Sequence, residues 1–227
     1  MNSPAALLTK IEESPRGTSR GEFVYRALCD AIKSGQIKQG TRVREEDIAS
    51  LLGVSRTPVR EALFRLQTRG LLEMAPGRGL VVVEITRQKL VELYAMRELL
   101  EGGAARMAAQ HASPSEVETL QYLLGEFLKA GDNAPRLAAL NRQFHSAIYD
   151  ATHNRHILTA MADLTDALAL LQNTTFSVPS RPKLALKEHR AIVNAIAQKN
   201  PDLAEQAARE HIRAAHQARA SMMLGQN

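Results

Sequence analysis

The chain contains few of the residues that disulfide, redox or membrane functions require. Its 227 residues include one cysteine and no tryptophan, and aromatic residues make up only 4%. A single cysteine excludes an internal disulfide framework. No apolar stretch approaches the roughly 18 residues of a membrane-spanning helix, and the N-terminus lacks the apolar segment of a signal peptide. The sequence therefore predicts a cytoplasmic protein that does not enter a membrane.

Common catalytic motifs are also missing. The sequence has no His-Glu-x-x-His zinc motif, phosphate-binding loop, dinucleotide-binding glycine pattern or nucleophile elbow. The formal net charge is +5, which suits a polyanionic partner without proving one. These features argue against an enzyme and leave a binding function as the better hypothesis.

The stretch at residues 53–63, which reads GVSRTPVREAL, is the most informative part of the chain. A short helical pattern precedes it, and Gly53 is expected to end that helix because glycine adopts the left-handed conformation easily. Ser55 is a good N-cap for a second helix, and Pro58 falls in its first turn, where a missing N–H does little harm. Two helices joined by a tight glycine turn indicate a helix-turn-helix.

The second helix of this motif has two different faces. Its apolar face repeats at the helical spacing i, i+3, i+4 and i+7, with Val59, Ala62, Leu63 and Leu66. Thr57, Arg60 and Phe64 fall on the opposite face, with Arg56 at its edge. Phe64 is expected to pack against the first helix or the helical bundle, and contact with a thymine methyl group is the alternative.

A predicted β-hairpin follows the helix-turn-helix. Residues 71–74 and 80–83 are β-prone, and between them residues 76–79 read PGRG, a turn with Arg78 at its tip. Such a wing commonly places an arginine near DNA phosphates or the minor groove. The alternative is an ordinary helical pair and hairpin whose surface arginines bind nothing.

Residues 20–85, including the GVSRTPVREAL stretch, resemble the DNA-binding domain of the GntR family of bacterial transcription regulators. The resemblance implies that DNA contacts come from Ser55, Arg56, Thr57, Arg60, Gly77 and Arg78. A winged helix-turn-helix monomer reads one half-site, so we expect a homodimer on a pseudo-palindromic operator.

The composition changes after Thr86, where alanine and leucine dominate. Proline, glycine and asparagine residues divide this part into six expected helices, at about 87–110, 114–130, 134–151, 155–175, 183–199 and 201–222. The predicted fold class is mostly α, with a winged helix-turn-helix followed by an all-α bundle. The predicted parts are a loose tail at 1–18, a DNA-binding domain at 19–85, and an effector-binding, metal-binding and dimerisation domain at 86–222.

Three histidines on three different predicted helices share a face with apolar residues. They are His145, His189 and His211, and Asn141 lies one turn before His145. One such histidine alone is usually a hydrogen-bonded core residue. Three together favour a common purpose, since each is costly to bury without a partner. A divalent metal satisfies three imidazoles at once, and Asn141 offers a neutral oxygen.

The second half of the chain resembles the ligand-binding domain of the FadR-like branch of the GntR family, in its shorter, VanR-like six-helix form. The supporting stretches are residues 93–101, 141–145, 188–192 and His211. Many relatives hold a metal with an aspartate and three histidines, and here Asn141 stands at the aspartate position. Imidazole ligands favour Zn²⁺ or Ni²⁺.

The same resemblance suggests a small carboxylate effector, for which Arg97 is the natural partner. A salt bridge between Arg97 and Glu101, one turn away, is the equally weighted alternative. The predicted function is therefore an effector-controlled transcription regulator. A regulator for which the metal itself is the signal remains the alternative.

Overall fold

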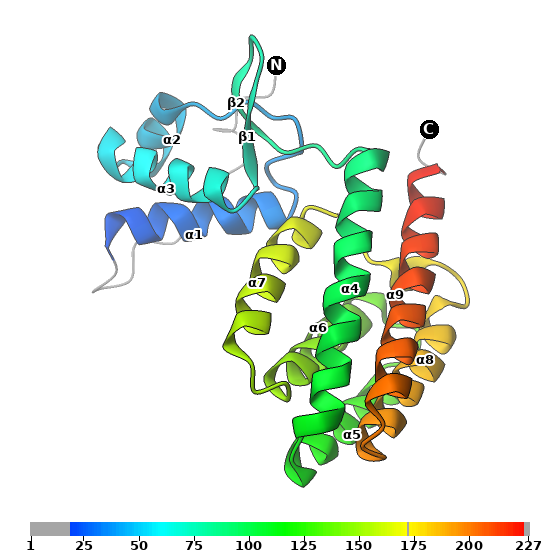
Figure 1. The fold of residues 1–227 in the computed structure, drawn as a ribbon. Coiled ribbons are helices and arrows are strands. Elements are labelled where there is room, and N and C mark those ends of the chain that lie inside the picture. Colours follow the sequence, from blue (N-terminus) through cyan, green and yellow to red (C-terminus); the bar gives the residue numbers. More distant parts are fainter. Residues whose placement is uncertain (1–18, 172, 225–227) are drawn as a thin grey trace. The chain divides into compact units, whose positions relative to one another are not determined.

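The computed structural model describes residues 19–171 and 173–224, which divide into two compact units (Figure 1). The first unit covers the part up to Thr86 together with a short segment beginning at Thr165, and the second covers the rest. The tail predicted for residues 1–18 lies outside the described residues.

The first unit is a winged helix-turn-helix. Its main elements are α1 (Arg20–Lys33), α2 (Glu45–Leu52), α3 (Arg56–Thr68), β1 (Leu72–Ala75) and β2 (Gly79–Val82). The strands pair antiparallel, with Leu72 opposite Val82 and Ala75 opposite Gly79. The predicted order of helix, turn, helix and hairpin is therefore confirmed (Figure 1).

Local sequence explains the boundaries of these helices. The Ser19 hydroxyl caps α1 by accepting a hydrogen bond from the Glu22 N–H at 3.2 Å. Gly53 ends α2 at φ +62°, a left-handed conformation that favours glycine. The apolar faces of α1 and α3 then pack together, and Val24, Leu28, Val59 and Leu66 are almost completely buried.

The second unit is built from helices. Its elements are α4 (Arg87–His111), α5 (Pro114–Lys129), α6 (Ala134–Asp150), the larger part of α7 (Arg155–Ala169), the 3-10 turn η2 (Thr175–Ser177), α8 (Arg181–Ala197) and α9 (Pro201–Leu224). Helices α4 and α9 run side by side over most of their length (Figure 1). Small residues allow this close approach: Ala104, Ala105, Ala108, Ala204 and Ala208 are all buried.

Most of the six predicted helix positions match, but the end of the fourth was wrong. Helix α7 ends at Ala169 rather than near residue 175. The chain leaves the helix at Leu170, whose side chain is buried in the core of the first unit. Periodicity did not reveal this, because leucine continues the helical pattern through residue 171. Among the described helices, none is both long and apolar enough to cross a membrane.

Candidate nucleic-acid interface and metal centre

The exposed side of α3 and the tip of the wing carry the residues that the sequence assigned to DNA. All six are exposed to solvent: Ser55, Arg56, Thr57, Arg60, Gly77 and Arg78. Pro58 and Val59 lie on the opposite, buried side of α3. The fold therefore presents the polar face of α3 outward, as a recognition helix requires.

Two details of α3 differ from expectation. Ser55 occupies the N-cap position, but its side chain makes no capping hydrogen bond with any described residue. Phe64 is 69% exposed, so the expected packing against a neighbouring helix is wrong. The helical wheel placed Phe64 correctly on the outer face, where the turn of α2 onto α3 leaves it uncovered. An exposed phenyl ring on this face is available for contact with a thymine methyl group.

Internal acceptors engage the three arginines assigned to DNA. Arg60 donates from Nε and Nη2 to the two carboxylate oxygens of Glu45, at 3.1 Å each. Arg56 Nη2 lies 3.1 Å from Glu46 Oε1. The wing residue Arg78 donates to the Gly40 carbonyl at 2.6 Å. The guanidinium groups are thus held by neighbouring groups while their side chains stay largely exposed.

The second unit brings the three predicted histidines together in its interior. His145 lies on α6, His189 on α8 and His211 on α9, and each is at most 5% exposed. One ligating nitrogen from each lies within 4.8 Å of the others. Three different helices therefore bring one imidazole each to the same place.

Glu101 of α4 holds the ring of His145 from behind. Its carboxylate accepts hydrogen bonds from His145 Nδ1 at 2.9 Å, Tyr149 Oη at 2.8 Å and Arg97 Nε at 3.2 Å. Burial alone would raise the pKa of this carboxyl, but His145, Arg97 and Tyr149 outweigh burial and hold the pKa well below its usual range. A carboxylate only accepts hydrogen bonds, so His145 carries a proton on Nδ1, and Nε2 is the nitrogen that the neutral ring offers to a metal.

Glu188 of α8 holds His211 in the same way. Its Oε2 atom accepts from His211 Nδ1 at 2.7 Å, and Arg181 Nη1 donates to both carboxylate oxygens at 2.8 and 3.0 Å. Burial raises the pKa of Glu188, and Arg181 opposes that shift. His145 and His211 therefore each belong to an Arg–Glu–His chain that fixes the ring orientation. The two chains are balanced in charge before any metal is considered.

The facing ring nitrogens provide a test of whether a metal fits. His145 Nε2 and His211 Nε2 lie 3.3 Å apart. Both Nδ1 atoms point at carboxylates, so each ring in its neutral form turns its Nε2 lone pair toward the other ring. Two nitrogens bound to a tetrahedral zinc ion at about 2.0–2.1 Å from the metal lie about 3.3 Å apart. The donor set and its spacing therefore fit a divalent cation.

His189 supplies the second observation that favours a metal. Its side chain is completely buried, and neither ring nitrogen has a hydrogen-bond partner among the described residues. Burial lowers its pKa well below the usual value, and the neighbouring His211 and His145 lower it further. The ring is therefore neutral at pH 7, the form that binds a metal. Phe144 stacks on it at 4.3 Å between ring centroids and limits its movement.

The other two predicted pocket residues are Asn141 and Arg97. Asn141 is half-buried on α6, one turn before His145. The Arg97 side chain is only 12% exposed and forms the ion pair with Glu101 that was the alternative to effector binding. A separate surface hollow includes none of the histidines and is lined by Asp202, Glu205, Gln206, Arg209 and Arg213.

Sequence reasoning missed the two carboxylates. The sequence assigns Glu101 a role only as a partner of Arg97, and Glu188 enters only as part of the stretch 188–192. A signal for both was present, because each glutamate interrupts an apolar row at helical spacing. Glu101 precedes Ala104 and Ala105, whereas Glu188 lies between Ala185 and Ile192, and all four neighbours are buried. A charged residue in such a row requires a buried partner.

A winged helix-turn-helix joined to a helical bundle with a buried ligating cluster defines a class of DNA-binding transcription regulators. Comparison with known proteins gives the family. Residues 20–82 match the family described as "Bacterial regulatory proteins, gntR family", and residues 92–214 match the FCD domain. The chain belongs to the GntR family, in the group whose second domain is an FCD domain, and its relatives are regulators rather than enzymes.

Individual relatives agree with this assignment. The "Probable D-xylose utilization operon transcriptional repressor" of Paenarthrobacter nicotinovorans is 35% identical over 81% of each chain. The "Glc operon transcriptional activator" of Escherichia coli K12 is 30% identical over 85% of each chain. The solved structure "E. coli McbR/YncC" shares the fold, with a TM-score of 0.72, 24% identity, and coverage of 92% of this chain and 100% of that one.

Proposed function

We propose that this DNA-binding regulator is controlled through a divalent metal held by His145, His189 and His211. The observation that carries the proposal is the pair of facing Nε2 atoms 3.3 Å apart, next to a buried imidazole whose nitrogens have no partner among the described residues. Zn²⁺ and Ni²⁺ suit this donor set best, and Asn141 is a weak fourth ligand. FCD domains often bind metal, which supports the proposal.

A small carboxylate is the proposed effector. Three neutral imidazoles leave the charge of a bound dication uncompensated, because Glu101 and Glu188 are each paired with an arginine. An anion is therefore attracted to an open coordination position. Arg97 is the proposed second point of contact, which requires the effector to share or displace its ion pair with Glu101.

Domain roles and assembly follow from the family. Residues 19–85 are proposed to bind DNA, whereas residues 86–222 hold the metal and effector and join two copies. A homodimer would present two recognition helices about 34 Å apart to a pseudo-palindromic operator. GntR regulators bind DNA operators and typically dimerise, which supports this arrangement.

The effector proposal is tested by measuring DNA affinity with the metal and the acid supplied separately. An operator is first obtained by selection from a random duplex pool with the full-length protein. Metal-free protein is then titrated with Zn²⁺ or Ni²⁺ alone, and next with small carboxylates in the presence of metal. We expect the affinity to change only in the second case. A complete response to metal alone would instead support the metal-sensing alternative. One relative is a repressor and another an activator, so either an increase or a decrease in DNA affinity supports the effector proposal.

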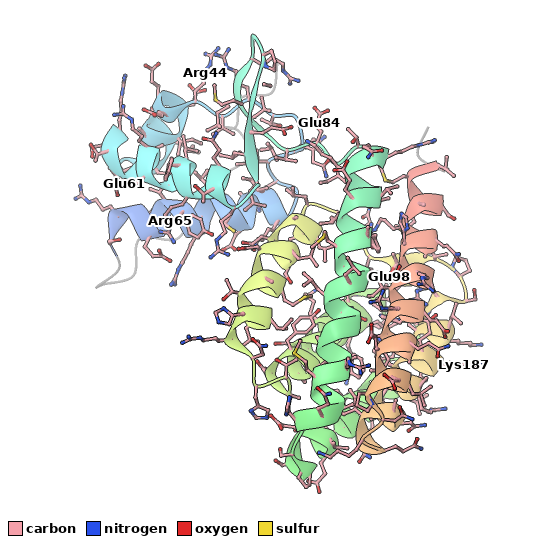
Figure 2. All side chains as sticks on the ribbon, viewed as in Figure 1. Arg44, Glu61, Arg65, Glu84, Glu98 and Lys187 are labelled. Carbon is pink, nitrogen blue, oxygen red and sulfur yellow. The ribbon has the colours of Figure 1, made fainter. Side chains whose placement is uncertain are left out.

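Arg60→Ala is expected to weaken binding to the selected operator about five- to hundredfold, because it removes a base or phosphate contact. Arg56→Ala should behave similarly. Arg65→Ala is the matched control, since Arg65 is on α3 too but pairs with Glu22 and lies over the Tyr25 ring of α1 (Figure 2). Gel-shift titration measures all three. Unchanged affinity in both Arg56 and Arg60 variants, with intact melting transitions, would reject the recognition-helix assignment.

Asn141→Asp is expected to tighten metal binding by about tenfold or more, because it adds a charged oxygen to three neutral ligands. It should also weaken the response to an anionic effector, since the site charge falls by one. Competition with a chromophoric chelator measures the metal affinity. Ser146→Asp, which adds the same charge on the exposed side of α6, is the control. Equal affinities in wild type and Asn141→Asp would show that position 141 does not face the metal.

A further inference from the structure

The recognition helix carries its own counter-charges, which come from the first turn of α2. Glu45 meets Arg60 through two parallel hydrogen bonds of 3.1 Å, and Glu46 meets Arg56 at 3.1 Å. The two arginines are one helical turn apart on α3, and the two glutamates are adjacent on α2. Each of the two arginines that α3 is proposed to present to DNA is therefore paired with an acid from α2.

The fold places these two glutamates close to the exposed side of α3. Gly53 turns the chain sharply between α2 and α3, so the start of α2 lies beside the exposed side of α3. Carboxylates are favoured in the first turn of a helix, where the backbone N–H groups carry partial positive charge. Hydrogen bonding to Arg60 also holds the pKa of Glu45 below its usual value. Glu45 is thus charged when DNA approaches at neutral pH.

The pairing affects sequence-specific and non-specific contacts differently. Glu45 engages Nε and Nη2 of Arg60, which leaves Nη1 unused by any described residue. An arginine held on one edge can still direct its end toward a guanine O6 or N7 atom. Attraction to phosphates depends on net charge instead, and the glutamate neutralises that charge. The ion pair therefore weakens the attraction of Arg60 to phosphates more than it weakens its contacts with bases.

We propose that Glu45 and Glu46 are specificity-determining residues, which orient Arg60 and Arg56 for base contacts and suppress their binding to unrelated DNA. The inference rests on the assignment of these arginines to DNA under the proposed function. Exposed ion pairs change an equilibrium by only about 1.5- to 5-fold. Base contacts with an operator can therefore outweigh the ion pair. Unrelated DNA offers only phosphates, and the glutamate reduces their attraction to the arginine.

Glu45→Gln tests the proposal, because it removes the charge and keeps the shape of the side chain. Affinities are measured for the selected operator and for a duplex of the same length with scrambled sequence, over a range of salt concentrations. We expect about two- to fivefold tighter binding to the scrambled duplex, and a smaller gain or a loss on the operator. The salt dependence on the scrambled duplex should steepen by about 0.9 in logarithmic slope, as one more phosphate is neutralised.

Glu61→Gln is the matched control. Glu61 is an exposed glutamate of α3 itself (Figure 2). Its carboxylate lies close to Gly21 of α1, so it serves as a control for removing one negative charge from the same helix. If Glu61→Gln gives the same gain, or if Glu45→Gln tightens both duplexes equally, the proposal is overturned. In an Arg60→Ala background the extra gain from Glu45→Gln should disappear. If instead Arg60→Ala alone leaves operator binding unchanged, the DNA assignment of Arg60 fails, and with it the premise.

Discussion

His189→Leu is expected to lose tight metal binding while its metal-free form becomes more stable than metal-free wild type. Loss of one of three ligands should weaken metal binding by more than about 100-fold, since even groups behind the ligands are worth 10–100-fold. The metal-free wild type buries an imidazole whose two nitrogens have no partner among the described residues. Replacing such a group with an apolar one of similar size stabilises a protein by about 1–3 kcal/mol.

Two measurements check the His189 prediction. Mass spectrometry of the native protein gives the metal content after incubation with Zn²⁺ or Ni²⁺, and urea denaturation of metal-free samples gives the free energy of unfolding. His153→Ala is the control, because His153 is exposed and pairs with Glu116 outside the cluster. Wild type that takes up neither metal would mean that the three histidines are polar lining of the core. The effector would then be held by direct side-chain contacts such as Arg97.

The sequence was most reliable where a residue has a single conformational role. Gly53 ends α2 with a positive φ and Pro58 occupies the first turn of α3, so these two positions fixed the helix-turn-helix in advance. The capping box of Ser113 and Glu116 at the start of α5 is a signal of the same kind. Such signals are local, and they act whatever the rest of the chain does.

Features that depend on tertiary neighbours were harder to predict. Helix α7 ends early although its leucine and alanine pattern continues, because Leu170 leaves the helix and is buried elsewhere. Phe64 was expected to be covered, yet the fold leaves it exposed. A helical wheel gives the direction of a side chain, but it does not say whether another element lies there.

The histidine cluster shows the same division between local and tertiary information. The three histidines could be found by periodicity, because each shares a face with apolar residues of its own helix. The apolar rows mark Glu101 and Glu188 as buried acids. Their partners required knowledge of which helices meet, since Glu101 on α4 contacts His145 on α6 and Glu188 on α8 contacts His211 on α9. Contacts between such distant segments leave no periodic pattern in the sequence.

Glu101→Gln is expected to cost about 3–5 kcal/mol of folding stability and about 10–100-fold in metal affinity. Glu101 is 2% exposed and accepts from His145, Tyr149 and Arg97 at once. Glutamine keeps the shape but leaves the Arg97 charge buried without its counter-charge, and its amide group adds a donor where donors already converge. The one oxygen that glutamine keeps must serve three donors, so the hydrogen bond that fixes the proton on His145 Nδ1 is weakened.

Glu98→Gln is the matched control for this last prediction. Glu98 lies one turn earlier on α4 and pairs near the surface with Arg213 and Arg209 (Figure 2). Glu98→Gln should lose little folding stability, because partly exposed ion pairs contribute little to it. Urea denaturation and chelator competition measure the two effects separately. Adding Arg97→Met to Glu101→Gln should restore most of the stability but not the metal affinity, since it removes the unpaired charge and leaves His145 unsupported. If the double variant recovers both, Glu101 only neutralises Arg97; if it recovers neither, the Arg97 charge is not the source of the instability.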